Sequence, residues 1–131
     1  MKVLALDFGR ARTGVAVSDP TGTLARPLCV VEQAATEDGL RQIGELVAQQ
    51  GPDRVVVGLP LTLGGDRGEQ ARETERFVEQ LTARLEIPVV LFDERFTTDL
   101  AQQSPSRSAE DARAAAHLLS SYLAWSSGAP A

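Results

Sequence analysis

Three carboxylates occupy positions where a negative charge needs compensation. Asp7 follows the apolar run 3–6, Glu94 follows the apolar run 88–92, and Asp111 falls in the first turn of an alanine-rich helix near the end of the chain. A carboxylate at the end of a buried strand costs several kcal/mol unless a cation, hydrogen bonds or water compensate it, so packing alone seldom places one there. Three carboxylates from three separate elements suggest a site for hard divalent cations.

The residue types favour Mg²⁺ or Mn²⁺ over zinc. The chain has one histidine and one cysteine, whereas carboxylate oxygens are the ligands that hard cations prefer. Two such ions roughly 4 Å apart can bind a phosphodiester, one activating the attacking water and the other stabilising the leaving oxygen. Bound cations would also ease the approach of a polyanion to a chain whose formal net charge is −5.

Each carboxylate also has a purely structural explanation, which the sequence leaves open. These explanations are a turn cap for Asp7, a variant capping box of Ser108 with Asp111, and a surface ion pair of Glu94 with Arg95. Asp93 is a reserve ligand only, because strand alternation points it away from the face of Glu94.

Arginine supplies 12 of the 13 basic residues. Many of the acidic residues fall on one expected helix, so the basic residues elsewhere can still form a positive surface. Several arginines lie in or beside expected loops, where the guanidinium fork can match phosphate oxygens. Four of them are predicted to bind the phosphates of the substrate: Arg10, Arg12, Arg95 and Arg107.

Hydrophobic periodicity predicts an α/β fold. Strands are expected at 2–8, 13–19, 22–31, 54–59 and 88–93, and helices at 36–50, 66–85, 98–103 and 109–125. Right-handed crossovers put the first strand beside the fourth and the fifth beyond it, which gives a mixed five-stranded sheet of order 3-2-1-4-5 with an antiparallel second strand. Asp7 and Glu94 then share the carboxyl edge of the sheet, where open α/β sheets bind ligands.

The length of 131 residues predicts one domain over 1–131, with a frayed end at 126–131. No apolar stretch approaches the length of a bilayer span and no secretory signal opens the chain, so we expect a cytoplasmic protein without membrane partners. The segment 58–65 lacks the ending of a nucleotide P-loop, and is either a loop at the edge of the substrate site or a plain connection.

Four blocks of the sequence resemble the YqgF (RuvX) family of pre-16S rRNA nucleases and Holliday-junction resolvase-like proteins. They are LALDFGRARTGVAVSDP, VVVGLPLTLGGDRGEQA, PVVLFDERFTT and EDARAAAHLLSSYL, in the order and approximate spacing of the family. The resemblance implies a ribonuclease H-like fold, a cytoplasmic location and divalent-metal-dependent cleavage near the 5′ end of 16S rRNA precursors. It also implies that Asp7, Glu94 and Asp111 are the catalytic metal ligands.

The resulting hypothesis is metal-assisted hydrolysis of a phosphodiester. Asp7 bridges two ions, Glu94 and Asp111 complete their coordination, and the loop arginines steer phosphates. Two departures from the family pattern concern substrate binding. The segment between 98 and 111 is shorter than usual, and Arg107 is the one basic residue left just before the last acid.

Other functions stay open at this stage. The expected substrate is either structured RNA, free or within precursor ribosomal particles, or branched DNA cut by a resolvase-like enzyme. The protein is expected to be a monomer or a homodimer. Actin-like ATPases open with a similar strand and hairpin, but 131 residues supply only one of their two domains, so no thermal shift with ATP is expected. A non-catalytic nucleic-acid or ribosome-associated module is the remaining alternative.

Overall fold

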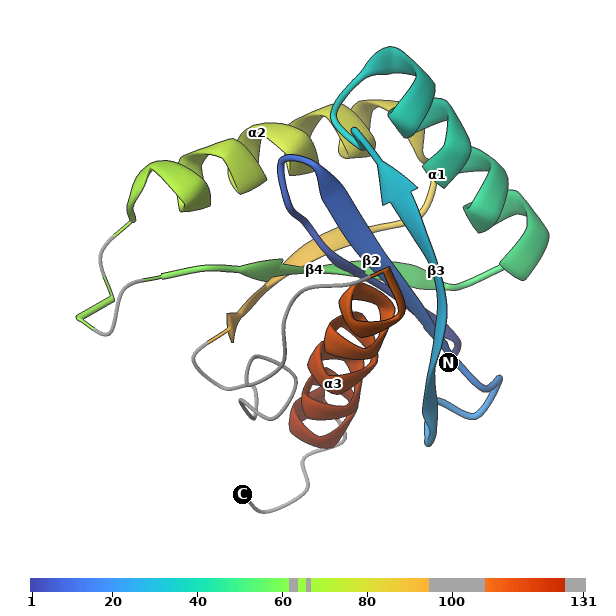
Figure 1. Cartoon of the computed structure of the whole chain (residues 1–131). Coiled ribbons are helices and arrows are strands. Elements are labelled where there is room, and N and C mark those ends of the chain that lie inside the picture. Colours follow the sequence, from blue (N-terminus) through green and yellow to red (C-terminus); the bar gives the residue numbers. More distant parts are fainter. Residues whose placement is uncertain (62–63, 66, 95–107, 127–131) are drawn as a thin grey trace.

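Five strands form one sheet with helices on both faces in the computed structural model of this chain (Figure 1). The structure describes residues 1–61, 64–65, 67–94 and 108–126. The strands are β1 (Val3–Asp7), β2 (Arg12–Ser18), β3 (Ala25–Glu32), β4 (Arg54–Leu59) and β5 (Val89–Asp93). The helices are α1 (Glu37–Gln50), α2 (Glu69–Arg84) and α3 (Ser108–Ser126).

The strand order is β3-β2-β1-β4-β5, which confirms the predicted topology. β2 runs antiparallel to both β1 and β3, while β1, β4 and β5 are mutually parallel. The parallel pairs need helical crossovers, which α1 and α2 provide. The helix expected at 98–103 lies outside the described residues, as does all but the first residue of the expected frayed end at 126–131.

The third strand begins at Ala25, three residues later than predicted. The carboxylate of Asp19 accepts hydrogen bonds from the backbone N–H groups of Thr23 and Leu24, and Gly22 takes a left-handed φ of 72°. The side chain of Asp19 therefore extends the tight turn at the expense of the strand.

Alternation along β1 assigns its residues to two separate cores. Leu4 and Leu6 belong to the core that includes Phe77 of α2. Val3 and Ala5 belong to the core on the other face, which includes residues 115–123 of α3. Because side chains alternate with a period of two, Asp7 shares the α3 face with Val3 and Ala5.

The same period governs β5. Val90 and Phe92 pack in the α3 core, so Glu94, one residue past the end of the strand, follows the parity that faces α3. Asp93 has the opposite parity, as predicted. Two carboxylates from different strands therefore reach the same face at the same edge of the sheet.

The first helix begins and ends where its sequence predicts. The hydroxyl of Thr36 accepts a hydrogen bond from the N–H of Gly39 at 3.1 Å, and Gly51 ends the helix with a left-handed φ of 61°. Within the described part of the chain, no helix has the length and apolar character needed to cross a membrane.

Candidate active site

The side chains of Asp7 and Glu94 meet at the carboxyl edge of the sheet. Their carboxyl groups share a hydrogen bond, and both side chains are half-buried. Burial raises the pKa of Asp7, and the nearby charge of Asp111 raises it further, although the hydrogen bond with Glu94 opposes these effects. The structure thus brings together two of the three predicted ligands.

The pKa of Glu94 is raised strongly. Burial first, and then repulsion by Asp7, raises the pKa of Glu94 to about 8. Two carboxylates in contact in a partly buried place cannot both stay ionised without a counter-charge. At neutral pH, Asp7 and Glu94 therefore share a proton. A cation bound between the two carboxyl groups could replace this proton.

Asp111 reaches the site because α3 packs directly on β2. A Cβ atom on Gly14 would lie 1.9 Å from the backbone oxygen of Asp111, so the helix occupies the space that any other residue would need. Gly14 is also the residue that pairs with Asp7 across the two strands. This close approach places the first turn of α3 beside the end of β1.

The side chain of Asp111 forms an ion pair with Arg12. The Nε atom of Arg12 lies 2.9 Å from Oδ2 of Asp111, and 22% of the Asp111 side chain is exposed. Arg12, one of the predicted substrate-binding residues, is thus placed at the site.

One cleft of about 400 Å³ is lined by Asp7, Arg12, Glu94 and Asp111. Its other lining residues are Phe8, Gly9, Ala11, Pro60 and Gln70. Gln70 lies in the first turn of α2 and brings an amide to the cleft, a contribution that sequence reasoning missed. Its neighbours Glu69, Arg72 and Glu73 make this part of α2 resemble a solvated helix face, so no local signal distinguished it.

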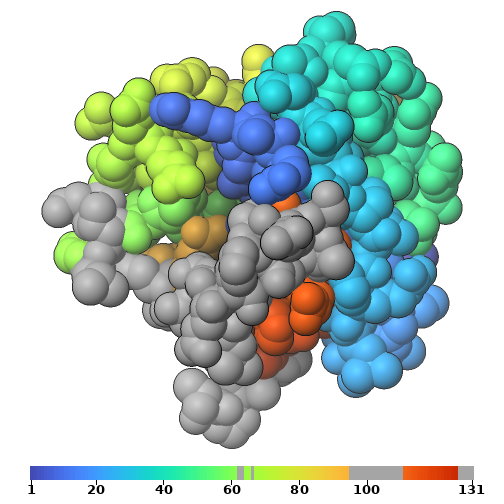
Figure 2. Space-filling model, in the orientation of Figure 1, coloured from blue at the N-terminus to red at the C-terminus, as the bar shows by residue number. Residues whose placement is uncertain are grey.

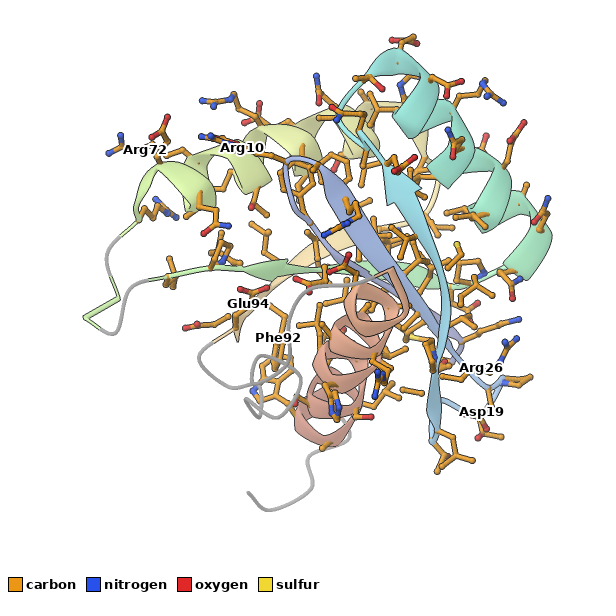
Figure 3. The ribbon with its side chains drawn as sticks, viewed as in Figure 1. Arg10, Asp19, Arg26, Arg72, Phe92 and Glu94 are labelled. Carbon is orange, nitrogen blue, oxygen red and sulfur yellow. The ribbon has the colours of Figure 1, made fainter. Side chains whose placement is uncertain are left out.

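Arg10 lies outside this cleft. Its Nε is 2.9 and 3.0 Å from the two carboxylate oxygens of Glu73 on α2, and Glu69 lies 3.7 Å from its guanidinium. Figure 3 shows Arg10 beside α2 and away from Glu94. The predicted contact of Arg10 with substrate is therefore untested, and its present partners are acids. The other two predicted arginines, Arg95 and Arg107, lie outside the described residues.

The loop between β1 and β2 is fixed against α2. The rings of Phe8 and Phe77 stack with centroids 4.3 Å apart, which adds to the ion pairs of Arg10. Figure 2 shows this blue loop at the surface, reaching the yellow-green residues of α2. The loop that joins Asp7 to Arg12, the first residue of β2, is therefore held in place by α2.

The donor set fits a hard divalent cation, because the site offers carboxylate oxygens that repel one another and are partly removed from water. Within the described ranges, however, no three His, Cys, Asp or Glu side chains are grouped closely enough to hold one ion. Asp7 and Glu94 are together, whereas Asp111 is engaged by Arg12. The three predicted ligands thus line one cleft without forming a closed ligand set.

The sequence of this chain matches that of a known family. The RuvX family, described as Holliday junction resolvase, matches residues 1–125. The chain belongs to the RuvX family. A relative from Desulforudis audaxviator with the name "Putative pre-16S rRNA nuclease" is 40% identical over 133 residues, and the match covers 94% of each chain. One from Chloroflexus aurantiacus with the same name is 46% identical over 101 residues. That match covers 77% of this chain but 66% of the relative, just under two thirds of its length.

The fold of this RuvX family member also has solved counterparts. T. thermophilus RuvC in complex with a Holliday junction substrate superposes with a TM-score of 0.64 over 98% of this chain and 97% of that one. At 18% sequence identity, this likeness concerns the fold alone. It agrees with the predicted ribonuclease H-like sheet.

Proposed function

We propose that this RuvX family member is a divalent-metal-dependent nuclease that matures the 5′ end of 16S rRNA precursors. The observation that carries the proposal is the pair of Asp7 and Glu94, held in contact in a cleft that Asp111 also lines. The names of its relatives supply the substrate. An enzyme of this kind would work in the cytoplasm, on precursor particles or on free precursor RNA.

Asp7, Glu94 and Asp111 would hold the cations, Mg²⁺ or Mn²⁺, with two ions as the expected number. The bound cations would activate a water molecule and stabilise the leaving oxygen of the phosphodiester. Asp7 shares a hydrogen bond with Glu94 and also interacts electrostatically with Asp111, so we propose it as a ligand alongside both of them.

The remaining lining residues have substrate roles. The side chain of Arg12 lines the cleft and is 38% exposed, so its guanidinium can bind a phosphate oxygen. Gln70 lines the same cleft, and its amide can donate or accept a hydrogen bond. We keep Arg10, Arg95 and Arg107 as proposed contacts for more distant phosphates.

The test compares the wild type with Asp7→Asn on pre-16S RNA, single strands and four-way DNA junctions, with Mn²⁺ and with EDTA. We expect cleavage of the precursor RNA by the wild type, and a loss of at least about a hundredfold in the variant, beyond what removal of an outer-shell partner costs. Asp38→Asn is the matched control, because Asp38 pairs with Arg41 on the surface of α1. Undiminished cleavage by Asp7→Asn would refute the proposal.

A resolvase-like activity is the second candidate, favoured by the description of the family and by the RuvC-like fold. Resolution of a junction requires two symmetric cuts, and so a dimer with two sites. Paired nicks in the four-way junction, with no cleavage of precursor RNA, would select this function instead. A wild type that binds RNA but cleaves nothing would indicate a binding module.

A further inference from the structure

Gly58 lies in β4 next to the carboxylate pair. Leu6 pairs with Val57, so Gly58 stands one residue along, beside Asp7. Val56 packs in the α3 core, and alternation gives Gly58 the same face. A Cβ atom on Gly58 would lie 2.6 Å from Oε1, 2.9 Å from Cγ and 3.1 Å from Cδ of Glu94. The side chain of Glu94 therefore occupies the space beside a residue that has no side chain.

The backbone conformation at this position does not require glycine. Among the described glycines, Gly22, Gly51 and Gly65 have a left-handed φ, and Gly58 does not. Glycine weakens a strand because it loses more conformational freedom on folding than other residues and has no side chain to pack. Its presence in β4 therefore needs another reason, and the contact with Glu94 supplies one.

Gly14 provides a useful contrast. A Cβ atom there would meet the backbone of Asp111, which cannot move unless the whole helix shifts. At Gly58 the obstructed atoms, Oε1, Cγ and Cδ, all belong to the flexible side chain of Glu94, which can rotate away. A methyl group at position 58 is therefore expected to displace the Glu94 carboxyl while the fold is kept.

We propose that Gly58 is a positioning residue, whose missing side chain lets the carboxyl of Glu94 lie against Asp7. The steric part of this proposal depends only on the contacts above. Its consequence for cation binding rests on the proposed function, because it assumes that the pair holds a metal ion. The two parts are tested separately.

The steric part is tested by a double-mutant cycle of Gly58→Ala and Glu94→Ala, with thermal unfolding measured at pH 5 without metal. In the Glu94→Ala background the obstructed atoms are gone, and we expect Gly58→Ala to raise the Tm. In the wild-type background, where the Glu94 side chain is present, Gly58→Ala should raise the Tm by less or lower it. Equal Tm changes in the two backgrounds would overturn the proposal.

The metal part is tested by calorimetric titration with Mn²⁺. Gly58→Ala should bind Mn²⁺ at least about tenfold more weakly than the wild type, the size expected when a ligand loses its support. Gly44→Ala is the matched control, since a Cβ atom there meets nothing within 4 Å. Equal Mn²⁺ affinity of the wild type and Gly58→Ala would overturn the inference. A wild type that binds no Mn²⁺ would instead overturn the proposed function, and the unfolding cycle would still decide the role of Gly58.

Discussion

At the scale of single residues, the site combines a pair of hydrogen-bonded carboxyl groups with an ion pair. Asp7 and Glu94 share a hydrogen bond, while Asp111 is neutralised by Arg12. Both arrangements compensate negative charge at the cleft. A bound cation would substitute for them, because its positive charge offsets the burial and the repulsion by Asp7 that raise the pKa of Glu94.

The raised pKa of Glu94 predicts a pH-dependent stability. Its ordinary value is 4.5 and its value in the fold is about 8, so between these pH values the folded protein binds more protons than the unfolded chain. The free energy of unfolding should therefore fall as pH rises through this window, when no metal is present. Urea unfolding at several pH values, with EDTA, measures this slope.

The control for this dependence is Glu94→Gln, which imitates the protonated side chain at every pH. We expect a flatter profile in the variant, with the remaining slope due to Asp7 and other groups. An identical slope in the wild type and the variant would show that Glu94 does not titrate as described.

Arg12 is predicted to act on substrate more than on folding. Its ion pair with Asp111 is partly exposed, so Arg12→Ala should change the free energy of unfolding by only about 0–1 kcal/mol. Loss of the guanidinium should raise KM for RNA more than it lowers kcat, while Mn²⁺ affinity is kept or increased. Steady-state kinetics and Mn²⁺ titration measure these effects.

Arg41→Ala is the control for this experiment. Arg41 pairs with Asp38 and Glu45 on the surface of α1, far along the chain from the cleft residues. Weaker Mn²⁺ binding by Arg12→Ala than by the wild type would contradict the expectation that Arg12 acts on the substrate and does not support the cation site.

At the scale of elements, the position of α3 decides whether Asp111 belongs to the site. The α3 core holds the helix against β1, β2 and β5, and the bare backbone of Gly14 lets its first turn approach β2. The predicted capping box at this turn is untested, because the side chain of Ser108 lies outside the described part of the structure.

We predict that Gly14→Ala destabilises the protein. The added methyl group would overlap the backbone of Asp111, and relief requires the helix to shift, so a loss of about 1–3 kcal/mol is expected. Urea unfolding measures the loss, and Gly44→Ala again serves as the reference. A Gly14→Ala protein as stable as the wild type would mean that α3 does not dock as described.

At the scale of the whole molecule, an acidic chain is proposed to act on a polyanion. Its formal net charge is −5, and the ion pairs of α2 and the β1–β2 loop use arginine for internal contacts. Bound cations would reduce the local negative charge at the cleft, so metal binding and RNA binding are expected to be linked.

Cation binding to the folded state should raise the Tm. A ligand present at a hundred times its Kd adds about 2.7 kcal/mol to the free energy of unfolding. The wild type should therefore show a thermal shift with Mn²⁺ that EDTA reverses, and Asp7→Asn should not. Without metal, Asp7→Asn should be at least as stable as the wild type, because it removes one of the repelling charges. A variant with a full Mn²⁺ shift would exclude Asp7 as a ligand.

Local patterns in the sequence predict the strands and helices that the structure describes, together with the order of the strands in the sheet. Runs such as 3–6 and 55–57 are continuous apolar strands, and helical spacing marks α1 and the end of α3. These patterns are local, because a period of two or 3.6 is set by the backbone alone. Crossover handedness then placed β1 beside β4 and β5 beyond it, which brought Asp7 and Glu94 to one edge.

Which side chains meet at this edge depends on tertiary packing. Strand parity assigns Asp7 and Glu94 to a face, but their contact depends on the empty space at Gly58. Arg10 and Arg12 lie two residues apart, and the sequence predicts that both bind phosphate. In the structure, Arg10 pairs with Glu73 on α2, whereas Arg12 pairs with Asp111 on α3. Such contacts join residues distant in the chain, and their geometry depends on how whole elements pack, which no local pattern encodes.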